Sequence, residues 1–159
     1  MIETPRPQDA PSIERVAKGS GVFTPAEIHI VTEMLGAFFN PEPRDDHTFV
    51  IYRNGNPTAV AGFACYGPTP LTDRVWDLYW LCVDPTQQRQ GIGSELLGRI
   101  EQDLCTRNAR AIYLETSDSA AYATARQFYE RHGYERLARI DNFYAPGDGK
   151  VIYRKVLDR

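Results

Sequence analysis

The chain has 159 residues, 42% of them hydrophobic and 25% charged, a composition typical of a globular protein that buries one core without disulfides or metals. Its net charge of -3 argues against nucleic acid as a partner, because binding a phosphate backbone needs a basic face, and no apolar run approaches the roughly 20 residues of a membrane span. The first residues lack the basic stretch and apolar core of a signal peptide, and three cysteines cannot all pair within one chain, so we expect a reduced, cytoplasmic protein.

The N-terminal part of the chain predicts a tail followed by two helices. Residues 1–10 are poor in apolar groups and contain prolines, which predicts a flexible tail before one domain over residues 11–159. A short helix is expected over residues 11–18. The run from Thr24 to Glu27 has the pattern of a capping box with proline at the first helical position, and it predicts a second helix over residues 25–39.

The rest of the chain alternates between strand and helix patterns. Residues 48–53 and 57–66 are rich in strand formers and flank Asn54-Gly55-Asn56, which predicts a tight antiparallel hairpin. Residues 75–83 are apolar on both faces and predict a central strand. The elements expected after it are a helix over 91–107, a strand over 111–116, a helix over 120–132 and two strands over 134–140 and 151–157.

Two glycines, Gly91 and Gly93, stand where the predicted central strand runs through a polar loop into an amphipathic helix. A helix start exposes four N–H groups and the positive end of the helix dipole, so a phosphate can settle there if the backbone comes close. The dinucleotide fingerprint would need glycine or alanine in place of Leu96, and the Gly-Lys-Ser/Thr of a P-loop is absent, so a nucleotide-binding module is disfavoured. An ordinary turn that uses glycine for positive φ would need no ligand.

The remaining pattern, Gln88-x-x-Gly91-x-Gly93 after a strand, resembles the coenzyme A loop of the GNAT superfamily of N-acetyltransferases. A second segment, residues 122–134, resembles the Asn-x-x-Ala-x-x-Phe-Tyr helix of that family and the glycine-aromatic pair that follows it. The resemblance covers roughly residues 47–157. It implies a GNAT-like α/β (α+β) fold with a central mixed, mostly antiparallel sheet, helices on both faces and a splayed pair of central strands.

The same resemblance implies acetyl-CoA as cosubstrate and no metal. The backbone of the central strand would pair with the pantetheine amides, unless a neighbouring strand fills that edge. The N–H groups of the loop would face the pyrophosphate, and the second segment would contact the cofactor arm. The implied cofactor-binding residues are Leu81, Cys82, Val83, Gln88, Arg89, Gln90, Gly91, Gly93, Ser94, Tyr122 and Phe128.

The resemblance also implies catalytic residues. Tyr129 matches a tyrosine that commonly lies beside the coenzyme A sulfur, where a phenol can protonate the departing thiolate as general acid; a packing aromatic is the alternative. The attacking amine has to lose a proton, and three choices stay open: Asp77 on the central strand, Glu115 on the next strand, or no dedicated base. Period-two alternation predicts that Asp77, Tyr79 and Leu81 share one face of the strand.

One position departs from the family pattern. Tyr122 stands where asparagine is usual, and a phenol cannot copy the paired donor and acceptor of a carboxamide. The aromatic connection over residues 141–149 is expected to form a long loop, and two alternatives stay open: a roof over the acceptor pocket, or an exposed turn with its two aromatic side chains tucked down. The leading hypothesis is acetyl transfer from acetyl-CoA to a primary amine of a small molecule or peptide by direct attack in a ternary complex, with a homodimer left open. The alternative is a non-catalytic CoA-binding regulatory or sensor module.

Overall fold

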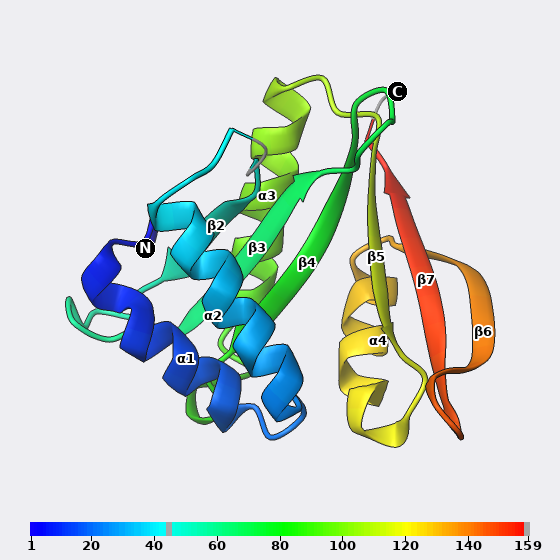
Figure 1. The fold of residues 1–159 in the computed structure, drawn as a ribbon, viewed down its shortest axis with the longest axis horizontal. Coiled ribbons are helices and arrows are strands. Elements are labelled where there is room, and N and C mark those ends of the chain that lie inside the picture. Colours follow the sequence, from blue (N-terminus) through cyan, green and yellow to red (C-terminus); the bar gives the residue numbers. More distant parts are fainter. Residues whose placement is uncertain (44–45, 158–159) are drawn as a thin grey trace.

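A single mixed sheet forms the centre of the computed structural model, which describes residues 1–43 and 46–157. The strands are β1 (Ile2–Glu3), β2 (Thr48–Tyr52), β3 (Gly62–Pro68), β4 (Val75–Val83), β5 (Ala111–Ser117), β6 (Glu135–Ala145) and β7 (Asp148–Val156). Their order is β1-β2-β3-β4-β5-β7-β6, and all neighbours are antiparallel except β4 and β5, which are parallel (Figure 1). The predicted mixed, mostly antiparallel sheet is therefore confirmed.

Helices cover both faces of this sheet. They are α1 (Ala10–Gly19), α2 (Pro25–Phe39), α3 (Ile92–Thr106) and α4 (Ala123–Arg131), with short 3-10 turns η1 (Pro7–Asp9), η2 (Pro85–Gln87) and η3 (Ala120–Tyr122). Helices α1 and α2 lie on one face of the sheet, and α3 and α4 lie on the other (Figure 1). The core under α1 and α2 includes Phe49 and Phe63, and the core under α3 and α4 includes Leu96 and Ile112. Within the described residues, none of these helices combines the length and apolarity that crossing a membrane requires.

The start of α2 follows directly from its sequence. The Thr24 hydroxyl accepts a hydrogen bond from the N–H of Glu27 at 3.2 Å, and the Glu27 carboxylate accepts one from the N–H of Thr24 at 2.7 Å. This reciprocal capping satisfies two N–H groups that a helix start leaves without partners. Val31 and Leu35 are buried on the face that meets the sheet, so the predicted helix bounds are confirmed.

The predicted N-terminal tail is wrong. Ile2 and Glu3 form a strand that pairs with β2, and α1 begins at Ala10. The Arg53 side chain explains why this segment is ordered, because its guanidinium forms ion pairs with the carboxylates of Glu3 and Asp9. The distance from the guanidinium to the Asp9 carboxylate is 2.7 Å. Composition alone does not reveal the pairing, since these partners lie more than 40 residues apart.

Two turn predictions also need correction. The β2 and β3 strands are antiparallel as expected, but the connection over residues 53–61 is longer than a tight Asn-Gly hairpin, because β3 begins only at Gly62. Residues 141–149 are not a loop, because β6 runs to Ala145 and β7 begins at Asp148. Asn142 adopts a positive φ of 55° inside β6 and accepts a hydrogen bond from the N–H of Gly147 at 2.8 Å, so its turn-forming character is used within a hairpin.

Candidate active site

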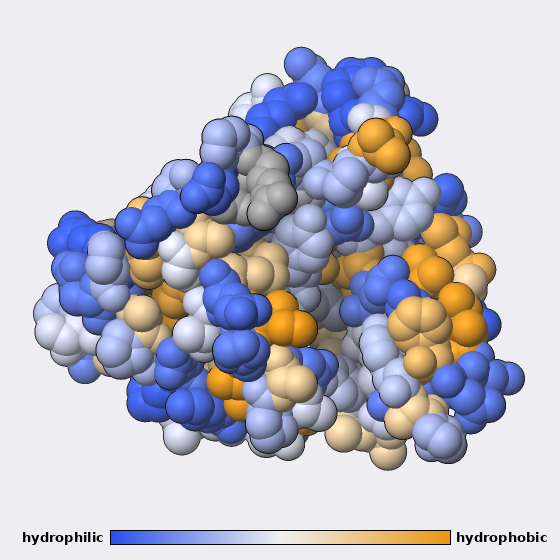
Figure 2. All heavy atoms as spheres, in the orientation of Figure 1, coloured by the Kyte–Doolittle hydropathy of each residue, from blue (hydrophilic) through white to orange (hydrophobic). Residues whose placement is uncertain are grey.

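The two central strands part after a short parallel ladder. Register pairs between β4 and β5 begin at Val75 and end at Asp77, whereas β4 continues to Val83 with pairing to β3 alone. The second half of β4 therefore presents an edge that no other described strand pairs with on the β5 side. A space-filling view shows the surface hollowed between α2 and the β5–β7 half of the sheet (Figure 2). This is the predicted splay, and it divides the sheet into two halves.

Backbone groups of β4 point into the splay at alternate residues. The N–H of Asp84, just after the strand, donates to the carbonyl of Ala61 at 2.8 Å on the β3 side. Because strand backbone groups alternate in direction, Cys82 also faces β3, and Leu81 and Val83 direct their N–H and C=O groups toward the splay. The Cys82 thiol is buried among α1 residues. Of the three predicted backbone contacts, Leu81 and Val83 thus have the suitable direction.

A bulge interrupts β4 at the splay. Trp80 pairs with Cys65 and Leu78 pairs with Tyr66, so Tyr79 is an extra residue without a partner on β3. As a result Leu78 and Leu81, three residues apart, both pack in the core under α3 and α4. The prediction that alternation places Asp77 and Leu81 on one face is therefore wrong, because a bulge reverses the alternation. Bulges of this kind re-aim side chains next to functional sites.

The glycine loop at the end of β4 adopts a conformation suited to an anion. Gly91 is the N-cap of α3 with a φ of 80°, and Arg89 also has a positive φ of 64°. The first α3 hydrogen bond runs from the N–H of Glu95 to the carbonyl of Gly91 at 2.9 Å, so the N–H groups of residues 91–94 have no acceptor among the described residues. Strain of this kind at Arg89 is common at ligand-binding loops.

Gly93 serves a different purpose from Gly91. A Cβ atom at Gly93 would lie 3.3 Å from the Phe128 ring and 3.7 Å from Val83, whereas one at Gly91 would meet no atom within 4 Å. Gly93 therefore lets Phe128 of α4 pack over the start of α3. Phe128 lies against the loop from the other half of the sheet, and it fixes the distance between α3 and α4.

Residues outside the motif hold the loop in place, and sequence reasoning missed them. Arg15 of α1 bonds to the Asp84 carboxylate at 2.7 Å, which lowers the pKa of Asp84. The Asn54 side chain donates to the side chains of Gln87 and Gln90 at 3.1 and 3.0 Å. Both contacts join segments more than 30 residues apart, so no local sequence signal reveals them.

Tyr129 lies at the inner end of the splay. Its side chain is only 9% exposed and packs against the rings of Phe128, Tyr134 and Tyr153. Burial raises the pKa of the Tyr129 hydroxyl, so the hydroxyl stays protonated. Among the described residues this hydroxyl has no hydrogen-bond partner, which is uncommon for a buried phenol.

Tyr122 spans the opening of the splay. Its hydroxyl donates to the carbonyl of Val22 in the α1–α2 connection at 3.2 Å, a contact between residues 100 positions apart. The pKa of Tyr122 is raised to about 12, mainly by burial and to a smaller extent by the negative charges of Glu27 and Asp148. The phenol that replaces the usual asparagine therefore ties α4 to the helices on the opposite face of the sheet.

The two carboxylates considered as bases lie near each other but differ in their surroundings. Asp77 is half-buried at the last residue pair of the β4–β5 ladder; burial raises its pKa, and the charge of Glu115 raises it further. Glu115 is exposed and forms an ion pair with Lys150 of β7 at 2.7 Å. Asp77 thus combines a raised pKa with freedom from any ion pair among the described residues, whereas Glu115 is already paired.

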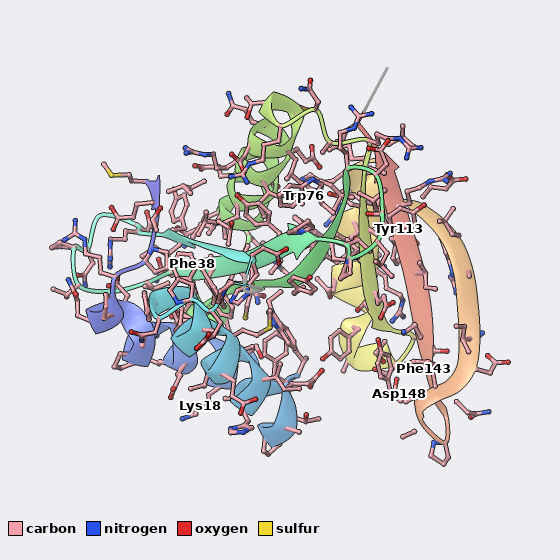
Figure 3. The ribbon with its side chains drawn as sticks, turned by 45° about the horizontal axis from the view of Figure 1, so that its top comes forward. Lys18, Phe38, Trp76, Tyr113, Phe143 and Asp148 are labelled. Carbon is pink, nitrogen blue, oxygen red and sulfur yellow. The ribbon has the colours of Figure 1, made fainter. Side chains whose placement is uncertain are left out.

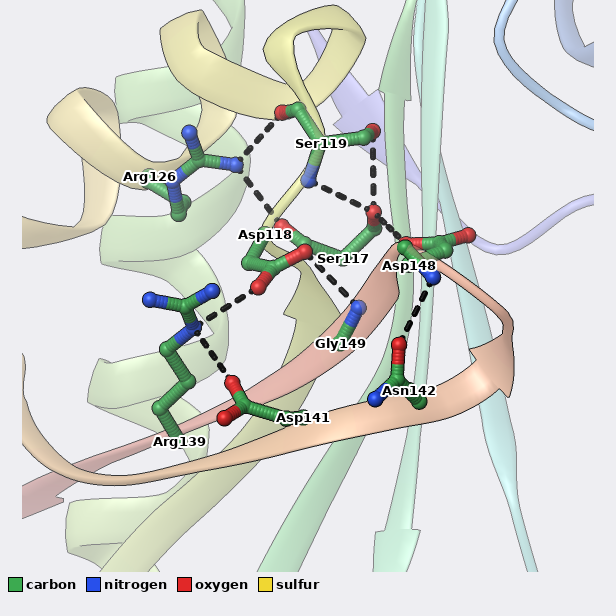
Figure 4. Close-up of polar contacts among 10 residues, drawn as sticks. Ser117, Asp118, Ser119, Arg126, Arg139, Asp141, Asn142, Asp148 and Gly149 are labelled. Atoms are coloured by element: carbon green, nitrogen blue, oxygen red, sulfur yellow. Dashed lines mark hydrogen bonds and ion pairs between the residues drawn. The ribbon is translucent and has the colours of Figure 1, made fainter.

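A polar network fixes the β6–β7 hairpin beside the start of α4 (Figure 4). Asp118 accepts hydrogen bonds from the N–H of Gly149 and the side chain of Arg139, both at 2.7 Å, and Ser117 donates to Asp148. Phe143 and Asp148 lie close together on this hairpin, at the other end of β5 from Tyr113 (Figure 3). The hairpin therefore forms one wall beside the splay in place of the predicted loop.

Comparisons with known proteins agree with this geometry. A family model described as an acetyltransferase (GNAT) domain matches residues 44–136. The ribosomal protein bS18-alanine N-acetyltransferase of Escherichia coli K12 is 31% identical over 99 residues, which are 62% of this chain and 66% of that protein. This chain thus spans slightly less than two thirds of the length of that relative.

Solved structures share the whole fold. A GNAT-family protein from Desulfovibrio desulfuricans has a TM-score of 0.93 and 36% identity, with 99% of both chains covered. The ribosomal-protein-S18-alanine N-acetyltransferase from Escherichia coli has a TM-score of 0.76 and 22% identity, covering 100% of this chain and 94% of that one. An aminoglycoside 6'-N-acetyltransferase complexed with coenzyme A has a TM-score of 0.76 and 18% identity, covering 100% and 98%.

A mixed sheet that splays beyond a parallel pair, with a glycine loop at the end of one parted strand, is the architecture of an acyl-CoA-dependent N-acyltransferase. The match of the family model over more than half of the chain identifies the particular family. This chain belongs to the GNAT acetyltransferases, as its two motifs predict.

Proposed function

We propose that this protein transfers an acetyl group from acetyl-CoA to a primary amine of a small molecule or peptide, by direct attack in a ternary complex. The observation that carries this proposal is the Tyr129 hydroxyl, on a buried side chain of α4, which has no hydrogen-bond partner among the described residues. A group in that position is available to a substrate atom rather than engaged in the fold. The relatives named above act on a protein alanine and on aminoglycosides, which fits an amine acceptor.

The residues of the splay have the groups needed to hold acetyl-CoA. Leu81 and Val83 would pair with the two pantetheine amides as an added strand, because their backbone groups face the unpaired edge. The N–H groups of residues 91–94 and the dipole of α3 would hold the pyrophosphate. The coenzyme A complex of the structural neighbour supports this cosubstrate.

The chemistry needs one proton donor and one proton acceptor. The amine nitrogen attacks the thioester carbonyl carbon, and the carbon–sulfur bond breaks as the tetrahedral intermediate collapses. Tyr129 protonates the departing thiolate, and Asp77 takes the proton that the amine loses, directly or through a water. Asp77 is favoured over Glu115 because Lys150 already pairs with Glu115.

The cofactor site is tested by adding a side chain where the phosphates would lie. Gly91→Asn should weaken acetyl-CoA binding by about tenfold or more while the protein stays folded, because asparagine tolerates positive φ and its carboxamide would occupy the approach to the N–H groups. Gly55→Asn is the matched control, since Gly55 has a φ of 77° and open space around it. If titration calorimetry gives the same acetyl-CoA affinity for both variants, the glycine loop is not part of the cofactor site.

The base is tested by pH profiles. Because a protonated carboxyl cannot accept a proton, kcat/KM should rise as pH increases through the raised pKa of Asp77. Asp77→Asn should lower kcat/KM at pH 7 by about 100-fold and move the rising limb to alkaline pH, toward the pKa of the amine itself. Glu115→Gln should keep the wild-type profile. An unchanged profile in Asp77→Asn would show that Asp77 is not the base.

One observation favours a second candidate, a non-catalytic CoA-binding sensor. Tyr122 ties α4 to Val22 across the opening of the splay, where the family has an asparagine toward the cofactor arm. A sensor would bind coenzyme A and acetyl-CoA without releasing thiol in the presence of any amine. A thiol-release screen over amines, aminoglycosides and peptide N-termini separates the two functions.

A further inference from the structure

His132 connects α4 to the first turn of α3. It is the C-cap of α4, its Nδ1 lies 2.7 Å from the carbonyl oxygen of Phe128, and its Nε2 lies 2.9 Å from the Oγ of Ser94. The imidazole also packs on the Phe128 ring, with centroids 4.2 Å apart. Ser94 is the third residue of α3, beside the N–H groups that the glycine loop leaves open. The histidine thus reaches the loop from the other half of the sheet.

These two contacts determine where the protons lie. A carbonyl oxygen can only accept, so Nδ1 of His132 carries a hydrogen. In the neutral imidazole Nε2 is then an acceptor, and the Ser94 hydroxyl donates its hydrogen to it. In the imidazolium Nε2 carries a hydrogen and donates to the Ser94 oxygen, which frees the hydroxyl hydrogen for another acceptor. The Ser94 hydroxyl is therefore available as a donor only while His132 is charged.

We propose that His132 and Ser94 act together as a phosphate contact of the cofactor site, and that His132 takes up a proton when coenzyme A binds. This inference rests on the proposed function, because it needs a phosphate group at the start of α3. The phosphate attracts the imidazolium, and the freed Ser94 hydroxyl donates to a phosphate oxygen. The proton comes from solvent, and no covalent bond other than N–H changes.

The carboxylates near His132 have other partners, so they do not prevent His132 from acting as a phosphate contact. Glu101 and Lys155 form an ion pair at 2.8 Å, and Glu130 accepts a hydrogen bond from Tyr153 at 2.8 Å. No carboxylate in the described part of the chain forms an ion pair with His132. The elements around His132 carry charges of both signs, and the residues are Arg89 of the loop, Glu95, Arg99, Glu101 and Asp103 of α3, Arg126, Glu130 and Arg131 of α4, and Asp148, Lys150, Arg154 and Lys155 of β7.

Calorimetry measures the proton uptake directly. Coenzyme A is titrated into the protein at pH 7 in phosphate-free buffers that differ in ionisation enthalpy, so that the slope of the heats gives the protons bound. The wild type should take up more protons than His132→Gln. His29→Gln is the matched control, because His29 lies on α2 beside Glu33 at 3.3 Å and should keep the wild-type value. Any proton exchanged by the phosphates of free coenzyme A is common to all three proteins.

Affinity as a function of pH tests the same linkage. Between pH 6 and pH 8.5 the wild-type affinity for coenzyme A should fall by about 3- to 10-fold more than that of His132→Gln, because a charge-assisted contact is lost. Ser94→Ala should weaken binding about threefold at pH 6 and little at pH 8.5, where the hydroxyl is already engaged by the neutral imidazole.

The outcomes separate this inference from the proposed function. Wild-type proton uptake and pH dependence in a His132→Gln protein that melts like the wild type would overturn the phosphate contact and leave the acetyltransferase site standing. Failure of the wild type itself to bind coenzyme A would overturn the proposed function. Reduced uptake confined to His132→Gln, with His29→Gln unchanged, supports the inference.

Discussion

Tyr129→Phe should lower kcat by about 10- to 1,000-fold with little change in the KM for acetyl-CoA. The substitution keeps the ring and its contacts with Phe128, Tyr134 and Tyr153 and removes only the hydroxyl. Because that hydroxyl has no partner among the described residues, its loss should not lower the melting temperature. Steady-state kinetics with any accepted amine, beside a thermal melt, measures both quantities.

Tyr153→Phe provides the matched control for this prediction. Tyr153 is fully buried, and its hydroxyl donates to Glu130 at 2.8 Å. Removing it should cost about 1 to 2 kcal/mol of stability and leave kcat nearly unchanged, which is the reverse of the result at Tyr129. Full activity of Tyr129→Phe would give Tyr129 a purely structural role and strengthen the sensor alternative.

Gly149→Ala should destabilise the protein by about 2 to 4 kcal/mol and raise the KM for the amine. A Cβ at this position would lie 2.6 Å from the Asp118 carboxylate and 2.8 Å from the carbonyl of Ile140, so it would push the β6–β7 hairpin away from β5. It would also break the hydrogen bond from the Gly149 N–H to Asp118. Denaturant unfolding and amine titration measure the two effects.

A glycine-to-alanine substitution in α3 should have the opposite effect on stability. A Cβ at Gly98 meets no atom within 4 Å, so Gly98→Ala should stabilise the protein by about 0.5 to 1 kcal/mol through helix propensity alone. Its KM for the amine should match the wild type. A Gly149→Ala protein with wild-type stability would show that the hairpin can move without cost, and the wall that we describe would then not be rigid.

Local patterns predicted the elements that position the site, because each depends on neighbouring residues. The apolar run from Val75 to Val83 coincides with β4, and the glycine loop stands at the start of α3 as its spacing indicates. The resemblance to a known family supplied the splay, which no periodicity reveals. These features follow from backbone propensity and from motifs of a few residues.

The remaining features depend on contacts between distant residues. The bulge at Tyr79 arises from the register between β3 and β4, and the Tyr122 bridge joins positions 100 apart. The contacts of Asn54 and of the His132 imidazole bring side chains to the glycine loop from other parts of the chain. Such contacts need three-dimensional placement, so the sequence named the loop but not the residues that hold it.

On the proposed function, the unpaired edge of β4 would let the bound substrate join the two halves of the sheet. Among the described residues, β4 and β5 share three register pairs. A pantetheine arm lying along Leu81 and Val83 would add contacts between the two halves while it is bound. Ligand present at about 100 times its Kd contributes about 2.7 kcal/mol to the folded state by mass action. In this protein the stabilisation by the ligand would act at the seam, the short β4–β5 ladder where the two halves of the sheet meet. Departure of the product would therefore loosen the same seam through which the next substrate has to enter.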